Sequence, residues 1–256
     1  MHWRILFTPP LSAVDNMALD GALLDRARES GETVLRVYGW RSPTLSFGRN
    51  QRARGLYDGD AAAARGVEVV RRPTGGRAVL HHREVTYSVT GPAATAQPLG
   101  ESYARINRLL LDGLLTLGVR AELARPAGRA PLPSGAPCFE TPTEGELVVG
   151  GRKLVGSAQF RERDAYLQHG SILIEDDQPL LAALATFPLP STVPAATLAA
   201  ALGAAPDPAD VAAALFAAVR RREDPGATML DLDRALSAAA ALAAAHYASD
   251  AWTWRR

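Results

Sequence analysis

A glycine-marked hairpin in the middle of the chain restricts its fold more than any other part of the sequence. In ELVVGGRKLVGSAQ, residues 146–159, two valine-containing runs flank Gly150 and Gly151. Adjacent glycines favour a tight turn between two strands, because both tolerate the positive φ angles that such a turn requires. AYLQHGSILIED, residues 165–176, has the composition of a further strand. The sequence therefore predicts a sheet that contains this hairpin and the strand after it.

The same region contains the only cysteine of the protein, Cys138, and its only lysine, Lys153. The other 27 basic residues are arginines. A chain that uses arginine almost everywhere is expected to keep a lysine where a guanidinium cannot replace an ammonium. The ammonium is compact and can lose its proton, whereas arginine stays charged. We therefore predict a chemical role for Lys153.

Cys138 is the candidate nucleophile. A thiolate is a strong nucleophile, and a nearby cation lowers the pKa of a thiol toward neutrality. A lone cysteine can instead be a small buried hydrophobic residue. Residues 125–137 before it are rich in proline, glycine, alanine and serine, which predicts a mobile loop that delivers the thiol to a pocket. Cysteine and lysine together suggest acyl transfer.

Composition excludes several other classes of protein. The 256 residues, 47% of them hydrophobic, are enough for one large domain with its own core. A formal charge of +1 gives no support for a nucleic-acid partner. One cysteine allows neither an internal disulfide framework nor a thiolate zinc site. The N-terminus MHWRILFTPP lacks the apolar core of a signal peptide, and no run approaches a membrane span. We expect a cytoplasmic enzyme with no membrane partner.

The remaining patterns predict a mixed α/β domain. Strand patterns cover residues 3–7, 33–40, 44–48, 67–72 and 84–89, and helical spacing covers residues 13–30, 60–65, 101–117, 207–221 and 230–248. Ser12 is suited to cap the first helix. Arg41, Ser42 and Pro43 form a turn signal between the second and third strands. We expect these two strands to form a hairpin at the start of a sheet.

A second glycine pair, Gly75 and Gly76, lies in RRPTGGRAVLHH, residues 71–82. Its backbone amides can approach a ligand closely, and the neighbouring Arg72 and Arg77 suit an anionic or carbonyl-bearing group. A double glycine alone is more often a simple turn. His81 and His82 cannot easily share a metal ion, because adjacent strand residues point to opposite faces. We expect one histidine in the pocket, the other in solvent, and no metal site.

Small residues inside the later strands mark a second part of the pocket. Gly156, Ser157 and Ala158 occur within one strand, a pattern expected where a ligand passes close to the backbone. His169 and Gly170 lie in the middle of the next strand. They are expected to line the same narrow space, although a buried histidine with satisfied hydrogen bonds explains His169 equally well.

Taken together, NMALD, YGW, TLSFG, RRPTGGRAVLH, ELVVGGRKLVGSAQ, LQHGSIL and YASDAW resemble the biotin/lipoate protein ligase superfamily, and most closely its LipM-type octanoyltransferase branch. TGGRAVLH has Arg77 where ligases often show a third glycine, and a cysteine before GRK is typical of the transferases. The resemblance implies one α/β catalytic domain with central mixed and antiparallel sheets flanked by helices. Residues 1–200 are expected to form its core. Residues 201–256 are expected to be an alanine-rich helical segment packed on the same domain.

The resemblance also implies roles for individual residues. Cys138 would carry the acyl group as a thioester, and Lys153 would lower the pKa of its thiol. The acceptor would be a lysine of a lipoyl domain, in the glycine cleavage H protein or a 2-oxoacid dehydrogenase E2 subunit. The donor would be octanoyl-acyl carrier protein, with no ATP and no other cofactor. The residues implied to bind substrate are Arg72, Gly75, Gly76, Arg77, Ala78, His81, Gly156, Ser157, Ala158, His169 and Gly170.

Three other functions are open at this stage. An ATP-dependent lipoate ligase would use the same pocket to form an acyl-adenylate, but it needs no cysteine. An amidotransferase would take the octanoyl group from another lipoyl domain instead of a carrier protein. A non-catalytic protein that only binds lipoyl domains would not explain why the single cysteine and the single lysine lie so close in sequence. We favour the octanoyltransferase because only the thioester route requires Cys138. The sequence leaves open the acceptor, the oligomeric state and any role of His82.

Overall fold

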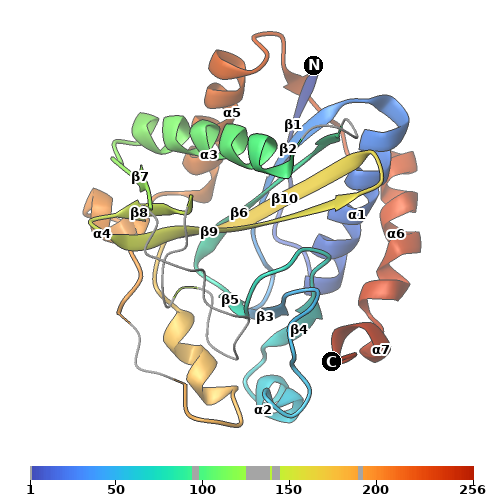
Figure 1. Ribbon diagram of the computed structural model, residues 1–256, viewed down its shortest axis with the longest axis vertical. Coiled ribbons are helices and arrows are strands. Elements are labelled where there is room, and N and C mark those ends of the chain that lie inside the picture. The colour runs from blue at the N-terminus through green and yellow to red at the C-terminus, as the bar shows by residue number, and fades with distance from the viewer. Residues whose placement is uncertain (1, 94–97, 125–138, 140–144, 190–192) are drawn as a thin grey trace.

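The computed structural model of the protein describes residues 2–93, 98–124, 139, 145–189 and 193–256. Helices and groups of strands are interspersed along the chain (Figure 1). In chain order they are β1 (Trp3–Phe7), α1 (Ala13–Ser30), β2 (Thr33–Tyr38), β3 (Thr44–Phe47), α2 (Gly59–Ala63), β4 (Glu68–Arg71), β5 (Val79–His81), β6 (Glu84–Pro92), α3 (Leu99–Thr116), β7 (Glu122–Leu123), β8 (Leu147–Val149), β9 (Arg152–Glu162), β10 (Ala165–Leu173), the 3-10 helix η1 (Gln178–Ala183), α4 (Leu198–Leu202), α5 (Pro208–Arg222), β11 (Thr228–Met229), α6 (Arg234–Tyr247) and α7 (Asp250–Thr253).

Within these residues the strands form two sheets. The larger sheet has eight strands in the order β11-β1-β2-β6-β10-β9-β8-β7, and the smaller has three in the order β4-β3-β5. The pairs β11 with β1 and β1 with β2 are parallel, and the remaining pairs of the large sheet are antiparallel. The mixed α/β class predicted from the sequence is confirmed.

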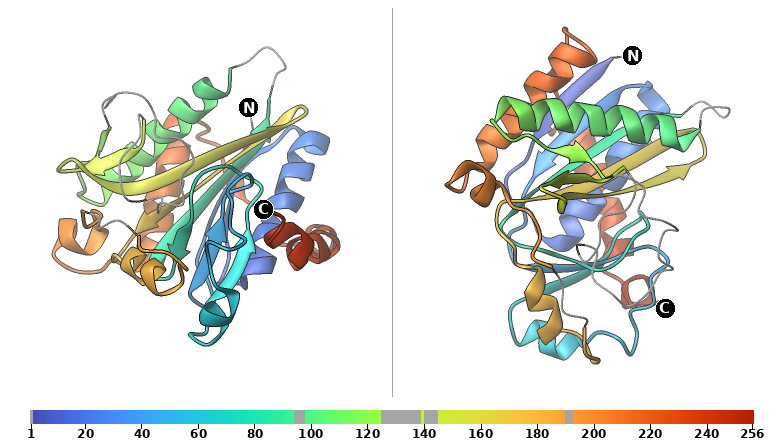
Figure 2. Two further views of the ribbon diagram at one scale, coloured as in Figure 1. Left: turned by 60° about the horizontal axis from the view of Figure 1, so that its bottom comes forward. Right: turned by 60° about the vertical axis from the view of Figure 1, so that its left-hand side comes forward.

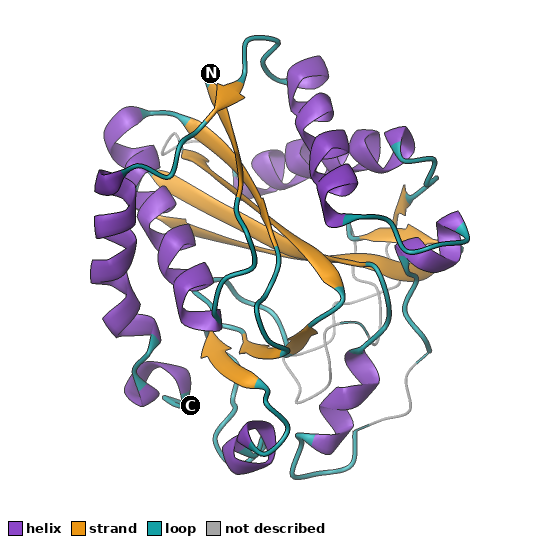
Figure 3. Ribbon diagram, turned by 180° about the vertical axis from the view of Figure 1, so that it is seen from behind, coloured by secondary structure: helices purple, strands orange, loops and turns teal. Residues whose placement is uncertain are grey.

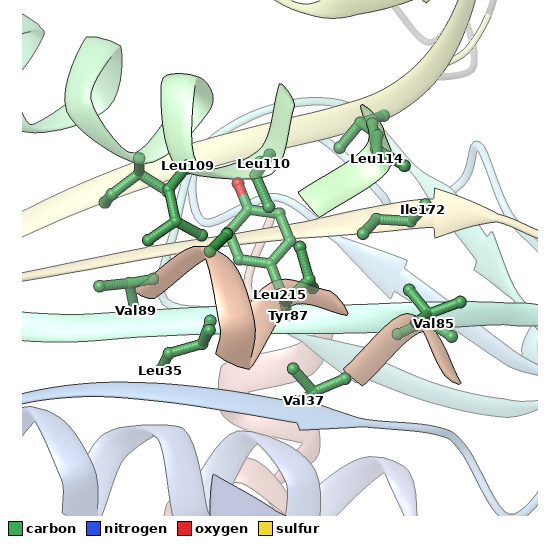
Figure 4. Packing of buried hydrophobic residues seen from close by; sticks show 14 of the residues in the cluster. Leu35, Val37, Val85, Tyr87, Val89, Leu109, Leu110, Leu114, Ile172 and Leu215 are labelled. Carbon is green, nitrogen blue, oxygen red and sulfur yellow. The ribbon is translucent and has the colours of Figure 1, made fainter. Parts of the chain in front are cut away.

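Helices cover both faces of the large sheet, as Figures 2 and 3 show. Strand β2 is buried along its whole length, and its side chains alternate between the two faces. Leu35 and Val37 join the main hydrophobic cluster, in which side chains from α3 and α5 pack on the sheet (Figure 4). Val34 joins a second cluster, with Leu19 and Leu23 of α1. Each face therefore has its own apolar core.

The predicted hairpin is confirmed. Strands β8 and β9 pair in antiparallel register, with Val149 opposite Arg152. Gly150 and Gly151 form the turn with φ angles of 56° and 73°, the left-handed conformation that side chains other than glycine rarely adopt. Strand β9 then pairs with β10, and β10 with β6. The hairpin is thus continuous with the centre of the large sheet.

The predicted pairing of the second and third strands is wrong. Strand β2 pairs with β1 and β6 in the large sheet, whereas β3 pairs with β4 and β5 in the small one. The chain bends at Arg41 and Ser42, but a turn signal does not decide which strand becomes the partner. The chain instead crosses here from one sheet to the other, and this crossing produces the space in which the cavity lies.

The residues after position 200 pack on several parts of the same fold. Helix α5 places Leu215 and Val219 in the main cluster, and β11 extends the large sheet beside β1. Helix α6 lies along α1 (Figure 1). The sequence pattern predicted helices here but did not predict β11. The boundary at residue 200 remains a prediction. None of the described helices has the length and apolar character needed to cross a membrane.

Candidate active site

A cavity of about 450 Å³ lies where the two sheets meet. This volume falls within the roughly 300–1,000 Å³ range of small-molecule sites. Its wall combines residues of α1, of strands from both sheets, and of the loops at residues 50–51 and 72–77. The segments predicted to form a pocket, which are far apart in sequence, therefore meet at one place.

Most of the residues singled out in the sequence line this cavity: Arg72, Gly75, Gly76, Arg77, His81, Lys153, Gly156, Ser157, Ala158, His169 and Gly170. Ala78 does not line it, because its methyl group is buried in the cluster of Leu45 and Phe47. Cys138 lies outside the described residues, and so does the predicted loop at residues 125–137. The chemical role of each lining residue stays a prediction.

Lys153 is buried in the cavity wall beside a carboxylate. Its Nζ donates a hydrogen bond of 2.6 Å to Oε1 of Glu146, and both side chains line the cavity. The same Nζ lies 4.9 Å from the ring centroid of Phe139, the residue that follows Cys138 in the chain. A buried ammonium needs such a partner, because an unpaired charge of this kind is strongly penalised by desolvation.

Gly156 makes room for this lysine. A Cβ atom at Gly156 would lie 3.0 Å from Cε and 3.3 Å from Nζ of Lys153, and 3.2 Å from Cζ of Phe139. The small residue predicted to accommodate a ligand therefore also accommodates the Lys153 side chain. Gly170, on the neighbouring strand, is equally constrained, because its Cβ would lie 2.6 Å from the carbonyl oxygen of Gly156.

His81 is held in the cavity wall by hydrogen bonds at both ring nitrogens. Its Nδ1 lies 2.8 Å from Oε1 of Glu84, and its Nε2 lies 2.7 Å from Oγ of Ser46. The ring also stacks on Trp40, with centroids 4.2 Å apart. His82 is exposed and lies 3.5 Å from Asp177. The expected division of the two histidines between pocket and solvent is confirmed.

His169 belongs to a second buried network. Its Nε2 lies 2.6 Å from Oγ1 of Thr74, and its Nδ1 lies 3.3 Å from Oδ2 of Asp20. Burial lowers the pKa of His169 despite the opposing influence of Asp20. For Asp20, burial alone would raise the pKa, but the hydrogen bond from His169 and the charge of Arg36 outweigh it and lower the pKa. The pair is therefore a neutral imidazole donating to a carboxylate.

Arg72 shapes the glycine loop from inside. Its guanidinium donates to the carbonyl oxygens of Ser46, Gly75 and Arg77 at 3.0, 2.9 and 2.7 Å. These bonds hold the loop against β3, where a Cβ at Gly48 would lie only 2.0 Å from the carbonyl oxygen of Gly76. Arg72 thus supports the cavity wall, and its predicted contact with an anionic or carbonyl-bearing group stays a prediction.

Several residues of the site carried no clear signal in the sequence. Glu146 is an ordinary acidic residue at the start of a strand pattern. A register shift between Leu147 and Val148 separates it from Lys153, so strand alternation alone does not place the two side chains together. Tyr38, Trp40 and Met17 also line the cavity. In the sequence these three residues look like ordinary core residues.

Among the described residues, no group of three or more histidine, cysteine or acidic side chains is arranged to hold a metal ion. The histidine and acidic side chains around the cavity instead form hydrogen bonds with each other and with arginine, serine and threonine side chains, as in the networks of His81 and His169. The arrangement provides a buried ammonium and carboxylate in the wall of a cavity large enough for a small molecule.

Comparison with known proteins agrees with the family predicted from the motifs. The chain belongs to the family of the lipoyl protein ligase A/B catalytic domain, whose sequence profile matches residues 12–220. The octanoyltransferase LipM of Kyrpidia tusciae is 51% identical over 195 residues, which cover 73% of this chain and 71% of the relative.

Solved structures of lipoate-protein ligases share the fold. Lipoate-protein ligase A bound with ATP has a TM-score of 0.80 at 21% identity, with 99% of each chain covered. A bipartite lipoate protein ligase of Thermoplasma acidophilum, in a study that includes its E2 lipoyl domain, has a TM-score of 0.76 at 20% identity, with 99% of this chain and 96% of the other covered. At these identities the likeness concerns the fold alone.

Proposed function

We propose that this protein is an octanoyltransferase of lipoate biosynthesis that carries the octanoyl group as a thioester on Cys138. The observation that carries the proposal is the buried ion pair of Lys153 and Glu146 in the cavity wall. Its ammonium lies against Phe139, the residue next to the only cysteine. The 51% identity with an octanoyltransferase LipM supports the same activity.

The reaction consists of two acyl transfers. In the first, the Cys138 sulfur attacks the carbonyl carbon of the donor thioester, so that one carbon–sulfur bond forms and another breaks. The proton of the Cys138 thiol ends on the thiol that leaves with the donor. In the second, the amine of an acceptor lysine attacks the new thioester. An amide bond forms, the Cys138 carbon–sulfur bond breaks, and one amine proton returns to the thiolate.

Lys153 and Glu146 act on the charge of the sulfur. An ammonium close to a thiol stabilises the thiolate and lowers the pKa of the thiol. Glu146 holds the ammonium in position by its 2.6 Å hydrogen bond. The carboxylate also offsets part of the positive charge, because an anion next to a thiolate disfavours it. The two residues therefore set the reactivity of Cys138 by opposing effects.

The donor in this proposal is an octanoyl-acyl carrier protein and the acceptor is a folded lipoyl domain. Exchange between two thioesters is nearly isoenergetic, so no ATP is required. A lipoyl domain as acceptor is supported by the family and by the E2 lipoyl domain that accompanies the ligase of similar fold. The little net charge of the chain favours recognition by local complementarity. The cytoplasm is the proposed location.

Intact-mass analysis tests the first step. After mixing with octanoyl-carrier protein in the absence of ATP, the enzyme is expected to gain one octanoyl group, and Cys138→Ala is expected to gain none. A mass increase that requires ATP, or one that persists in Cys138→Ala, would instead support an ATP-dependent ligase that forms an acyl-adenylate.

A comparison of acceptors tests the second step. The acylated enzyme is expected to modify a folded lipoyl domain far faster than a peptide with the same target lysine, because a peptide lacks the surface for docking. Equal rates with both acceptors would contradict recognition of the folded domain. Replacing the carrier-protein donor by an octanoylated lipoyl domain in the same assay distinguishes the transferase from an amidotransferase.

A further inference from the structure

A group of exposed or half-buried arginines lies beside the segment of the cavity wall at residues 50–51 and has no role in the steps above. Its members come from residues 49–54 and from residues 255–256, two segments that are joined in space. The carbonyl oxygen of Arg256 accepts hydrogen bonds from the backbone N–H groups of Ala53 and Arg54, at 2.9 and 2.7 Å, and the guanidinium of Arg255 donates to the carbonyl oxygen of Arg49. We call this group the arginine surface; it consists of Arg49, Arg52, Arg54, Arg255 and Arg256.

Aromatic residues hold part of the arginine surface in place. The guanidinium of Arg49 lies 4.6 Å from the ring centroid of Phe160, and that of Arg255 lies 4.2 Å from the ring of Trp252. Arg54 donates to the carbonyl oxygen of Trp254 at 3.0 Å. A guanidinium stacked on an aromatic ring keeps its N–H edges available to an incoming anion. The surface is therefore partly organised before any partner binds.

Acidic side chains lie beside one end of this surface, where Asp58, Asp60 and Asp250 line a groove together with Arg54. Within the described part of the chain, none of its five arginines is in an ion pair, although arginines elsewhere pair with acidic side chains. Burial and then the neighbouring charges of Arg49 and Arg256 lower the pKa of Arg255. Asp250 lines a groove next to Arg54, and Asp58 beside it caps the start of α2. The five arginines are thus close together and form no ion pair within the described residues, although the chain as a whole has a net charge of only +1.

The arginine surface adjoins the cavity wall in sequence and in space. Asn50 and Gln51 lie between two of its arginines in sequence and line the cavity themselves. The preceding residue pair, Gly48 and Arg49, packs on the glycine loop, where the backbone N–H of Arg49 donates to the carbonyl oxygen of Thr74 at 2.7 Å. A partner bound to these arginines would therefore lie next to a segment of the cavity wall, Asn50 and Gln51.

We propose that the arginine surface docks an acidic face of the protein that delivers the acyl thioester. This inference rests on the proposed function and adds the place at which the donor binds. Five arginines spread over two segments exceed what one phosphate group contacts, so the surface fits a protein partner. The donor is favoured over the acceptor because the donor must insert the acyl chain into the cavity. The acceptor meets the acyl group only after it is attached to Cys138.

The test uses two double variants with the same change in charge. Arg52→Glu with Arg256→Glu reverses two exposed side chains of the arginine surface for which the structure gives no side-chain bond. Arg108→Glu with Arg234→Glu does the same on the outer sides of α3 and α6, and serves as the control. Each protein is assayed for acylation of Cys138 with three donors: octanoyl-carrier protein, octanoyl-coenzyme A and octanoyl-pantetheine.

We expect the surface variant to lose tenfold or more in kcat/KM with the carrier protein, on the scale of about 10 to 10³ by which electrostatic steering changes association rates. Its rate with octanoyl-pantetheine and octanoyl-coenzyme A is expected to stay within about twofold of the parent, because neither presents an acidic protein face. The difference between parent and variant is expected to shrink as ionic strength rises. The control variant is expected to match the parent with all three donors.

Each other result has a distinct meaning. An equal loss with octanoyl-coenzyme A would identify a phosphate site and overturn the proposal. An equal loss in the control variant would show that the effect comes from the net charge of the protein and not from this surface. No loss of kcat/KM with the carrier protein in the surface variant would show that the surface does not dock the donor. A defect only in transfer from acylated enzyme to a lipoyl domain would make this the acceptor's surface. Failure of every donor to acylate Cys138 in the parent would refute the proposed function itself.

Discussion

Two buried cations, Arg36 and Lys153, serve the same fold in different ways. Arg36 lies behind the cavity wall, fully buried, and forms an ion pair with Asp20 at 2.8 Å. Lys153 lies in the wall and forms an ion pair with Glu146 at 2.6 Å. Both charges are removed from solvent, yet one position uses the residue that this chain prefers and the other uses its only lysine.

Geometry explains the difference. All three nitrogens of the Arg36 guanidinium are used: Nε and Nη2 donate to Thr8, Nη1 to Asp20 and the carbonyl oxygen of Asn16, and Nη2 also to the Asn16 side chain. A fork of donors fits a set of fixed acceptors. Lys153 is confined next to Gly156, where its Nζ approaches within 3.3 Å of the position a Cβ would take. A compact head group that can exchange a proton fits here. We therefore expect the arginine to have a structural role and the lysine a chemical one.

The first way to break this comparison is to exchange the head group of the reactive cation. Lys153→Arg is expected to lose about 10²-fold or more in turnover, the scale of one positioned acid–base group, because the larger guanidinium does not fit beside Gly156 and does not exchange its proton near neutral pH. Steady-state octanoyl transfer to a lipoyl domain measures this. Near-parent turnover would remove any special role for the lysine.

Lys153→Ala removes the ammonium altogether and so tests its effect on the Cys138 thiol. Without the ammonium, the pKa of the Cys138 thiol is expected to rise toward about 8.5, the unperturbed value. The rate of Cys138 alkylation as a function of pH measures the shift. An unchanged thiol pKa would show that Lys153 does not act on the sulfur.

The reverse exchange tests the structural cation. Arg36→Lys keeps the charge next to Asp20 but loses most of the hydrogen bonds to Thr8 and Asn16. We expect the free energy of unfolding to fall by about 2 kcal/mol, since a hydrogen bond contributes roughly 1 kcal/mol and more where a charge is involved. Urea unfolding measures the loss. The pH profile of Cys138 alkylation should stay that of the parent, and a shifted profile would contradict the division of roles.

The sequence predicted the secondary structure of this arrangement better than the partners of its side chains. The helix at residues 13–30 with its Ser12 cap and the turn at Gly150 and Gly151 follow from local rules, and the structure has both. The partners of β2 and β3 depend on which sheet buries each strand, so a turn signal could not establish them. The same limit applies to ion pairs. Asp20 and Glu146 are each one carboxylate among many until the fold brings a cation next to them.

A smaller effect is expected from the carboxylate beside the lysine. Glu146→Gln keeps an oxygen that can accept from Nζ of Lys153 but removes a negative charge from the neighbourhood of the thiol. The pKa of the Cys138 thiol is therefore expected to fall, by up to about one unit, the common spread of such shifts. Alkylation of Cys138 against pH measures it. A rise in the thiol pKa would mean that Glu146 acts only by holding Lys153 in place.

The smallest effect concerns the histidine of the structural network. Burial and its surroundings lower the pKa of His169 from its ordinary value of 6.5. The unfolded chain therefore binds a proton at this residue at a higher pH than the folded protein does. The resulting stability is present above pH 6.5 and is lost as the pH falls below it toward the folded-state pKa. The folded protein is therefore expected to lose stability between pH 7.5 and pH 5.5 through this residue. Urea unfolding at pH 7.5, 6.5 and 5.5 is compared between the parent and His169→Gln, so that only the difference in how the free energy of unfolding changes with pH is used.

The variant is expected to lose less stability between pH 7.5 and 5.5 than the parent. An equal pH dependence in both proteins would mean that the pKa of His169 is the same in the folded and the unfolded state. A neutral imidazole would then contribute nothing to the stability of the network around Asp20.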